Sequence, residues 1–75
     1  MERRPVSSSL IRSVGYDLPA SVLEIELNNG SVYEYFDVPY SVYLELLEAD
    51  SKGSFFNEWV RDLYAYEEVE TADVD

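Results

Sequence analysis

Apolar and polar residues alternate from Leu23 to Leu27, and further along Tyr33 and Tyr35 alternate with Val32, Glu34 and Phe36. A period of two is typical of a β-strand with one buried and one solvated face. Between the two runs stands Asn29-Gly30, a pair that adopts positive φ at little steric cost and therefore favours a tight turn. The pattern predicts a β-hairpin at the centre of the chain.

The length of the hairpin loop decides which side chains share the buried face. A two-residue loop would pair Ile25 with Glu34 and place that carboxylate among apolar side chains. A three-residue loop, residues 28–30, would pair Ile25 with Tyr33 instead. Burying an unpaired carboxylate costs several kcal/mol, whereas exposed like charges across a ladder cost roughly 0.2–1 kcal/mol. We therefore predict the three-residue loop, with Tyr33 and Tyr35 on the core side.

A further strand is predicted before the hairpin, from Leu10 to Tyr16. Its alternation is imperfect, because Arg12 shares a face with Val14 while Ile11 lies on the other face. A proline-containing turn joins this strand to the hairpin. Together these segments predict a three-stranded antiparallel meander.

Beyond the hairpin the apolar period changes from that of a strand to that of a helix. A first helix is predicted over residues 39–50, because proline and aspartate suit a helix start and apolar residues then recur at helical spacing. Gly53 is expected just after its end, and Ser54 is expected to cap a second helix. The apolar face of that second helix follows i, i+3, i+4, i+7: Phe56, Trp59, Val60 and Leu63. The predicted fold is α+β, in the order β-β-β-α-α, with both helices on one face of the sheet.

The periodic part of the chain sets the expected domain limits. We expect a flexible N-terminus over residues 1–5, one domain over 6–66 and a disordered acidic tail over 67–75. No apolar run approaches the ~18 residues of a membrane span, and the N-terminal arginines lack the apolar segment of a secretory signal. The expectation is a cytoplasmic protein without a membrane partner.

Acidic residues outnumber basic ones by 16 to 5, which gives a formal net charge of −11. A field of this sign repels phosphate backbones unless the few cations cluster. Lys52 is the single lysine among many acidic residues. This composition is also common in proteins from salt-loving organisms, where the charge reflects the solvent and not a partner. Both interpretations stay open.

The composition also limits the chemistry. The chain has no cysteine and no histidine, which excludes zinc fingers, thiol nucleophiles and histidine general bases. A domain of 75 residues has little room for an enclosed pocket. We expect no enzyme activity, no cofactor and no metal.

The order of short motifs along the chain resembles that of the KTSC domain. The matching residues are Val6, Ser8-Ser9, Gly15-Tyr16, the alternating run from Leu23 to Tyr35, Val38-Pro39, Ala49, Ser51-Lys52-Gly53, Phe56-Asn57, Arg61 and Tyr64. In this resemblance Tyr33-Glu34-Tyr35 takes the place of the family's central Tyr-x-Tyr. The family is a short module found alone and at the C-terminus of some lysyl-tRNA synthetases. The resemblance implies a small interaction module for which that fusion suggests binding of RNA or tRNA.

Seven residues form the candidate nucleic-acid site: Arg12, Tyr33, Tyr35, Lys52, Gly53, Ser54 and Arg61. The two tyrosines suit stacking on bases, although strand aromatics also suit a core. The run from Ser51 to Ser54 suits an anion, although the same residues suit a turn between helices. The three cations either converge or serve as separate partners of an acidic surface.

A different function is open as well. A protein-interaction module would use an apolar helix face or an open sheet edge. Convergence of the cations would favour nucleic acid, whereas an exposed apolar patch that includes Phe55 or Trp59 would favour a protein partner or self-association.

Overall fold

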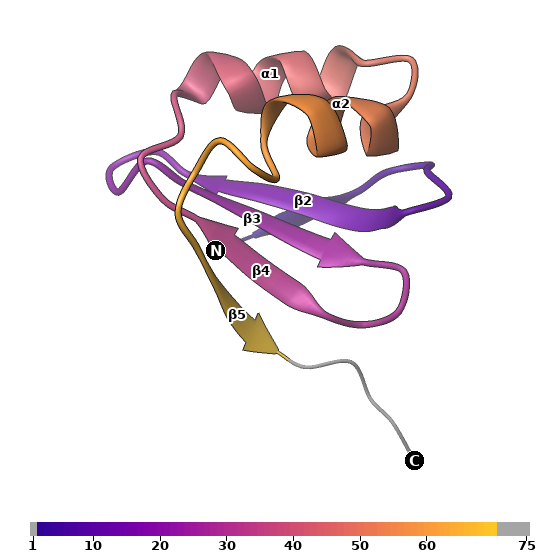
Figure 1. Ribbon diagram of the computed structural model, residues 1–75, viewed down its shortest axis with the longest axis horizontal. Helices are drawn as coiled ribbons and strands as arrows, with labels where there is room; N and C mark the ends of the chain where they lie inside the picture. The colour runs from indigo at the N-terminus through magenta and orange to yellow at the C-terminus, as the bar shows by residue number, and fades with distance from the viewer. Residues whose placement is uncertain (1, 71–75) are drawn as a thin grey trace.

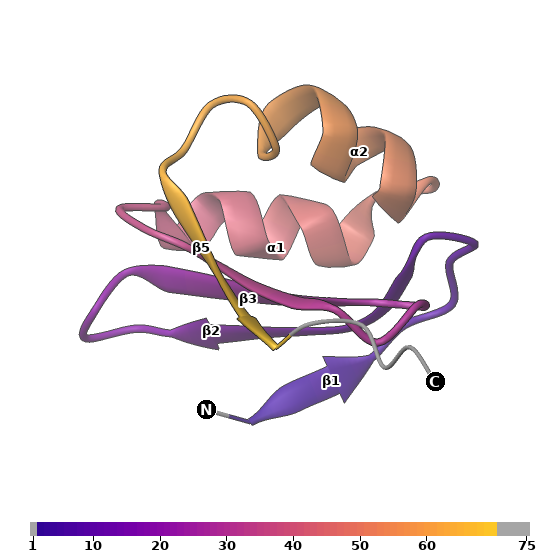
Figure 2. The ribbon, with the colours of Figure 1, turned by 60° about the horizontal axis from the view of Figure 1, so that its bottom comes forward.

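Two α-helices lie on one face of a five-stranded antiparallel sheet, as Figures 1 and 2 show. The computed structural model describes residues 2–70. The strands follow each other in the sheet as they do in the chain, and both helices come between β4 and β5. The predicted α+β class is confirmed. In chain order the elements are β1 (Arg3–Pro5), β2 (Ile11–Asp17), β3 (Val22–Leu27), β4 (Val32–Tyr35), α1 (Tyr40–Glu48), α2 (Lys52–Trp59) and β5 (Tyr66–Glu70).

The central hairpin has the predicted register. Ile25 pairs with Tyr33, and Leu23 pairs with Tyr35. The Leu27 backbone N–H donates to the carbonyl of Ser31 at 2.9 Å, which closes a three-residue loop. Gly30 ends that loop with φ of 97°, a conformation that glycine adopts without strain.

The first strand of the meander differs from the prediction at Arg12, where its regular pairing is interrupted. The register between β2 and β3 shifts between Ile11 and Ser13, so Arg12 sits in a bulge. A bulge adds one residue to its strand and reverses the alternation beyond it. Ile11 therefore shares the core face with Val14, and both are fully buried. The predicted separation of these two side chains onto opposite faces is wrong.

The sheet has two strands more than the predicted meander. Arg3–Pro5, expected in a flexible N-terminus, pairs with Ser13 to Gly15 as β1. Tyr66–Glu70, expected to run into a disordered tail, pairs with β4 as β5. A three-stranded meander exposes unpaired backbone groups along both edge strands, and β1 and β5 satisfy them. The rest of the predicted tail, residues 71–75, lies outside the described residues.

The junction between the helices also differs from the expectation. Ser51 caps α2, because its hydroxyl oxygen accepts a hydrogen bond from the Ser54 backbone N–H at 3.3 Å. Gly53 therefore lies in the first turn of α2 and not after the end of α1. A Cβ at Gly53 would lie 3.3 Å from the Cβ of Leu10, so the lack of a side chain lets the segment before β2 approach the helix. Among residues 2–70, no helix is long and apolar enough to cross a membrane.

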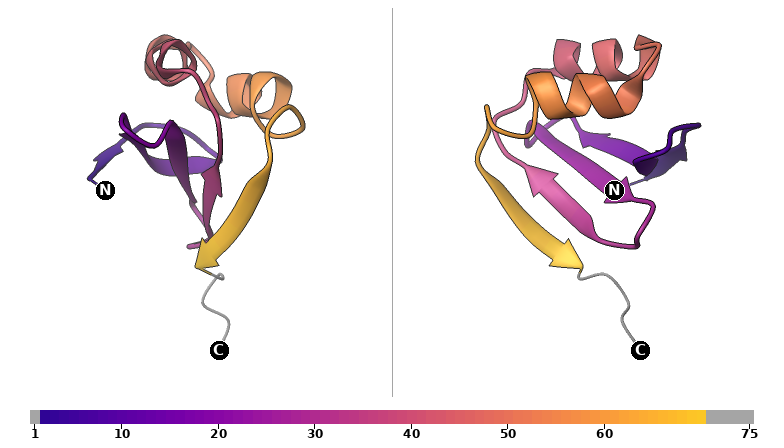
Figure 3. Two further views of the ribbon diagram at one scale, coloured as in Figure 1. Left: turned by 90° about the vertical axis from the view of Figure 1, so that its left-hand side faces the viewer. Right: turned by 45° about the vertical axis from the view of Figure 1, so that its right-hand side comes forward.

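The hydrophobic core lies between the sheet and the helices, which cover the same face of it (Figure 3). Each of its residues is at most 3% exposed: Ile11, Val14, Leu23, Ile25, Tyr35, Val38, Leu46, Phe56 and Val60. The opposite face of the sheet is acidic, as the alternation predicts. There Glu24 pairs with Glu34 across β3 and β4, and Glu34 pairs with Glu67 across β4 and β5.

Candidate binding cleft

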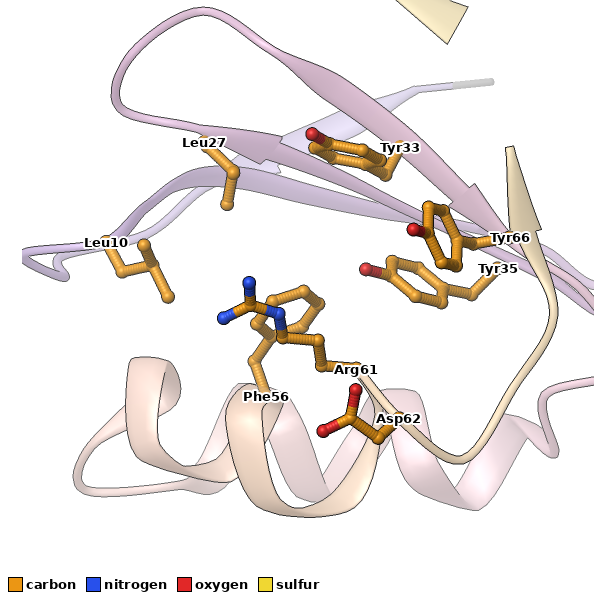
Figure 4. A pocket seen from close by; sticks show the side chains of 8 residues that line it. All are labelled: Leu10, Leu27, Tyr33, Tyr35, Phe56, Arg61, Asp62 and Tyr66. Carbon is orange, nitrogen blue, oxygen red and sulfur yellow. The ribbon is translucent and has the colours of Figure 1, made fainter. Parts of the chain in front are cut away.

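A cleft of about 340 Å³ lies between α2 and the sheet near strands β4 and β5 (Figure 4). The strands contribute three tyrosines, Tyr33 and Tyr35 from β4 and Tyr66 from β5. Phe56 of α2 lies opposite them, and Arg61 and Asp62 come from the turn that follows the helix. Leucines from β3 and from the segment before β2 complete the far end of the cleft. This volume is of the size that receives a small ligand or one group of a larger ligand.

The three tyrosines differ in exposure although their rings adjoin. Tyr35 is only 3% exposed and meets Phe56 edge to face, with ring centroids 5.6 Å apart. Tyr33 is half-buried, and Tyr66 is 57% exposed. The Tyr66 ring lies 5.5 Å from Tyr35 and 5.8 Å from Tyr33, centroid to centroid. The predicted core role is therefore confirmed for Tyr35, and the aromatic surface open to a ligand belongs to Tyr66 and Tyr33.

Arg61 brings the positive charge of the cleft. Its side chain lines the cleft together with Phe56 and the tyrosines (Figure 4), and its Nη1 donates to Oδ1 of Asn57 at 3.4 Å. The carboxylate of Asp62 lies on the helix side of the cleft, as Phe56 does. The cleft thus offers a planar cation and an anion from consecutive residues, beside an aromatic wall.

The hydroxyls of Tyr33 and Tyr35 stay protonated at neutral pH. Burial raises the pKa of Tyr35 to about 12, although the positive charge of Arg61 opposes this rise. The Glu68 carboxylate raises the pKa of Tyr33 by accepting a hydrogen bond from its neutral hydroxyl. A neutral phenol both donates and accepts hydrogen bonds, so these hydroxyls suit polar edges of a ligand.

The other predicted cations do not line this cleft. The guanidinium of Arg12 donates to the carbonyl of Asn28 at 2.7 Å and lies 3.7 Å from the Glu26 carboxylate. The Lys52 ammonium donates to the carbonyl of Ala49 at 3.1 Å. The described contacts thus join Arg12 to the hairpin and Lys52 to the end of α1, and they bring neither cation to Arg61.

The run from Ser51 to Ser54 forms the connection between the helices. The Ser51 hydroxyl donates to the Ser54 hydroxyl at 3.0 Å and also accepts from the Ser54 backbone N–H. Gly53 faces Leu10 and the hydroxyl of Ser8. These contacts fit the turn-and-cap interpretation of this run, and they leave Gly53 and Ser54 outside the cleft.

Sequence reasoning missed Tyr66, Asp62 and Phe56 as residues of the cleft. The sequence predicts Phe56 on a helix face and within the KTSC-like motif, and Tyr66 at the end of the domain, but it gives neither residue a binding role. A signal for Tyr66 was present, because Tyr64 and Tyr66 alternate with Ala65 and Glu67 in the period of a strand. Acidic composition concealed it. Among residues 2–70, no cluster of side chains suits a metal ion.

Comparison with known proteins identifies the family. The family model described as KTSC domain matches residues 7–66. An uncharacterised protein of Stutzerimonas stutzeri is 47% identical over 58 residues, which cover 77% of this chain and 82% of that protein. A lysine–tRNA ligase of Nostoc punctiforme is 41% identical over 61 residues, which cover 81% of this chain but 11% of the ligase.

A solved structure agrees with this assignment. The crystal structure of a KTSC domain protein from Yersinia pestis superimposes with a TM-score of 0.87 at 36% sequence identity. The match covers 92% of this chain and 97% of that chain. The resemblance drawn from the sequence motifs is thus confirmed, and this chain belongs to the KTSC domain family.

Proposed function

We propose that this chain is a non-catalytic interaction module and that its cleft receives one unpaired nucleotide of an RNA. The observation that carries this proposal is that one cleft brings together the Arg61 side chain and the open rings of Tyr33 and Tyr66. An RNA ligand is further supported by the relatives, because lysine–tRNA ligases contain a homologous region.

The aromatic wall would hold the base. The exposed Tyr66 ring provides the stacking face, and Tyr33 borders it at 5.8 Å between centroids. Stacking of a base on an aromatic side chain contributes about 1–3 kcal/mol and tolerates any base, because every base has a π-face. Arg61 would bind the attached phosphate, for which a guanidinium provides paired donors.

Asp62 would then add a preference among bases. Its carboxylate accepts hydrogen bonds, and adenine, cytosine and guanine carry an exocyclic amino group that donates them. Uracil has no such group. We therefore expect oligo(A) and oligo(C) to bind more tightly than oligo(U) of the same length.

The charge of the chain limits the strength of this binding. With a formal net charge of −11 and one cation lining the cleft, the protein has little general attraction for a phosphate backbone. One neutralised phosphate on a single strand gives a salt slope of only about −0.7. The module would therefore bind locally and weakly, as an addition to RNA contacts made elsewhere.

The test is an amide-shift NMR titration with short oligo(A) and oligo(U). We expect shifts at Tyr33, Arg61 and Tyr66 that are larger with oligo(A), and we expect Arg61→Ala to remove them. Arg4→Ala is the matched control, because it deletes the same charge from exposed β1, outside the cleft. Equal loss in both variants, or no shifts at low salt, would contradict the proposal.

A further inference from the structure

A second concave surface lies on the helices, away from the tyrosine cleft. This interhelical groove has a volume of about 370 Å³ and is lined by Val42, Glu45, Phe55, Trp59, Leu63 and Tyr64. It lies where α1 and α2 run side by side on one face of the sheet (Figure 3). Trp59 is 53% exposed and Leu63 is 61% exposed.

Helix α2 therefore carries two apolar faces. Phe56 points to the core and is 3% exposed, whereas Trp59 lines the groove beside Phe55, which also packs against the core. A helix that only covered a core would need the first face alone. Large apolar side chains gathered in a concave surface are typical of a contact site for a partner.

Among the described residues, the one charged residue that lines the groove is acidic. Glu45 lines it, and the exposed residues Glu48 and Glu58 lie on the same two helices. Lys52 is the one cation within α1 and α2, and its ammonium is bound to the carbonyl of Ala49. Arg61 extends into the tyrosine cleft on the other side of α2. An occupant must thus bring apolar side chains for the floor and positive charge for the rim.

We propose that the interhelical groove binds an amphipathic helical segment of another protein, with leucine-like residues on one face and lysine or arginine beside them. A helix laid between two helices presents its i, i+3, i+4 and i+7 residues to such a groove. The nine residues of α1 extend about 13 Å, so two to three turns of a partner helix match its length.

The charges disfavour the other occupants. A second copy of this chain would bring its own Glu45 against the first, and each copy has a formal net charge of −11. The segment that follows residue 70, Thr-Ala-Asp-Val-Asp, is itself acidic. Like charges brought together at an interface disfavour association. The inference is independent of RNA binding, because it uses the other face of α2.

Trp59 makes the test direct, because it is the single tryptophan of the chain. The probe is a synthetic helical peptide of about 14 residues, four turns, with leucine at i, i+3, i+4 and i+7 and lysine elsewhere. A matched peptide carries glutamate in place of lysine. Docking would shift the Trp59 emission to shorter wavelength with the lysine peptide and leave it unchanged with the glutamate peptide.

Two leucines of equal exposure provide matched variants. Leu63 lines the groove and is 61% exposed, whereas Leu18 lies in the turn after β2 and is 62% exposed. We expect Leu63→Ser to weaken binding of the lysine peptide about tenfold, which corresponds to 1.4 kcal/mol. Leu18→Ser should change this affinity less than about twofold. Circular dichroism checks that both variants fold.

The rim is tested by a second pair. Glu45→Lys reverses a charge in the groove, whereas Glu2→Lys makes the same change at an exposed residue that does not line it. We expect only Glu45→Lys to weaken the lysine peptide. Equal effects within either pair would overturn the proposal. Sedimentation that shows a dimer dissolved by Leu63→Ser would overturn it too, because a second copy would then occupy the groove.

Discussion

Glu24 and Glu34 face each other across β3 and β4, and the Glu34 carboxyl group raises the pKa of Glu24. Burial of the Glu24 side chain, which is 13% exposed, is the main cause of the raised pKa, and the interaction with Glu34 adds to it. Arg3, whose Nη1 lies 3.4 Å from the Glu24 carboxylate, opposes it. The acidic face of the sheet is therefore a place where charge opposes folding at neutral pH.

The pair predicts a pH dependence of the free energy of unfolding. Because the pKa of Glu24 is higher in the folded chain, the folded state binds the proton more tightly between the unfolded and folded pKa values. The contribution of this group to stability is full at lower pH and is lost as pH rises through the folded pKa. We expect Glu34→Gln to stabilise the protein by roughly 0.2–1 kcal/mol at neutral pH and to flatten this dependence. Urea unfolding at several pH values measures it.

Glu58→Gln is the control for this prediction. Glu58 is an exposed residue of α2, so the substitution removes the same charge at a place away from the Glu24–Glu34 pair. Glu58→Gln should leave unchanged the slope of the free energy of unfolding against pH between pH 4 and pH 7. A slope that both variants flatten equally would mean that net charge alone is responsible.

The close approach of β1 to Gly15 leads to a second prediction. A Cβ at this position would lie 2.7 Å from the backbone carbonyl oxygen of Glu2, a distance at which the strand must move away. We expect Gly15→Ala to displace β1 and to lower the free energy of unfolding by about 1–3 kcal/mol. Hydrogen exchange should speed up at the amides of β2 that pair with β1.

A truncation separates this effect from damage to β2 itself. If Gly15→Ala acts through β1, the substitution should cost little in a chain that lacks residues 1–5, because the three atoms nearest to the new methyl group belong to Glu2 and Arg3. A full loss of stability in the truncated chain would contradict the account.

The hairpin could be predicted from the sequence because its signals are local. Asn29-Gly30 and the alternation on either side specify a turn and two buried faces within fifteen residues of chain. The choice of loop followed from one energetic argument, the cost of burying Glu34. The bulge at Arg12 had no such signal, since it depends on how β2 aligns with β3.

The edge strands could not be predicted because they carry no buried pattern. All five residues of β5 are exposed, and β1 contains two arginines and a proline. Such segments pair because β2 and β4 offer free backbone groups, which is a property of the finished sheet. The same reason explains the missed part of the cleft, since Tyr66 reaches Tyr35 only through the pairing of β5 with β4. Tyr33, Tyr35 and Arg61 are predictable from the sequence, because paired strand aromatics and a cation suit a nucleic-acid ligand.

Ser51 predicts the stability of the helix junction. Its hydroxyl oxygen accepts the Ser54 backbone N–H at the start of α2, and Ser51→Ala leaves that donor without its partner. The loss of an N-cap of this kind costs about 0.5–2 kcal/mol. Thermal unfolding measures it, and Ser7→Ala at an exposed position before β2 is the control, for which we expect no change.

Two leucines of α1 test how the helix packs on the core. Both belong to α1, but Leu46 is fully buried and Leu44 is 43% exposed. Leu46→Ala should cost about 2–5 kcal/mol, because it removes apolar contacts and leaves a cavity. Leu44→Ala should change the free energy of unfolding by less than about 0.5 kcal/mol. Similar values for the two variants would mean that α1 does not pack as described.

Tyr35 predicts the behaviour of the protein in alkali. Burial raises its pKa from 10.0 to about 12 in the folded chain, whereas the unfolded chain ionises it at the ordinary value. Stability from this group is therefore full below pH 10 and is lost as pH rises toward 12, by up to about 2–3 kcal/mol. Tyr35→Phe removes the ionisable hydroxyl but keeps the ring against Phe56, so it should stay folded to a higher pH than the natural chain. Circular dichroism during an alkaline titration measures this, with Tyr40→Phe, at a ring that is 46% exposed, as the control. An alkaline midpoint that Tyr35→Phe leaves in place would show that another group drives the transition.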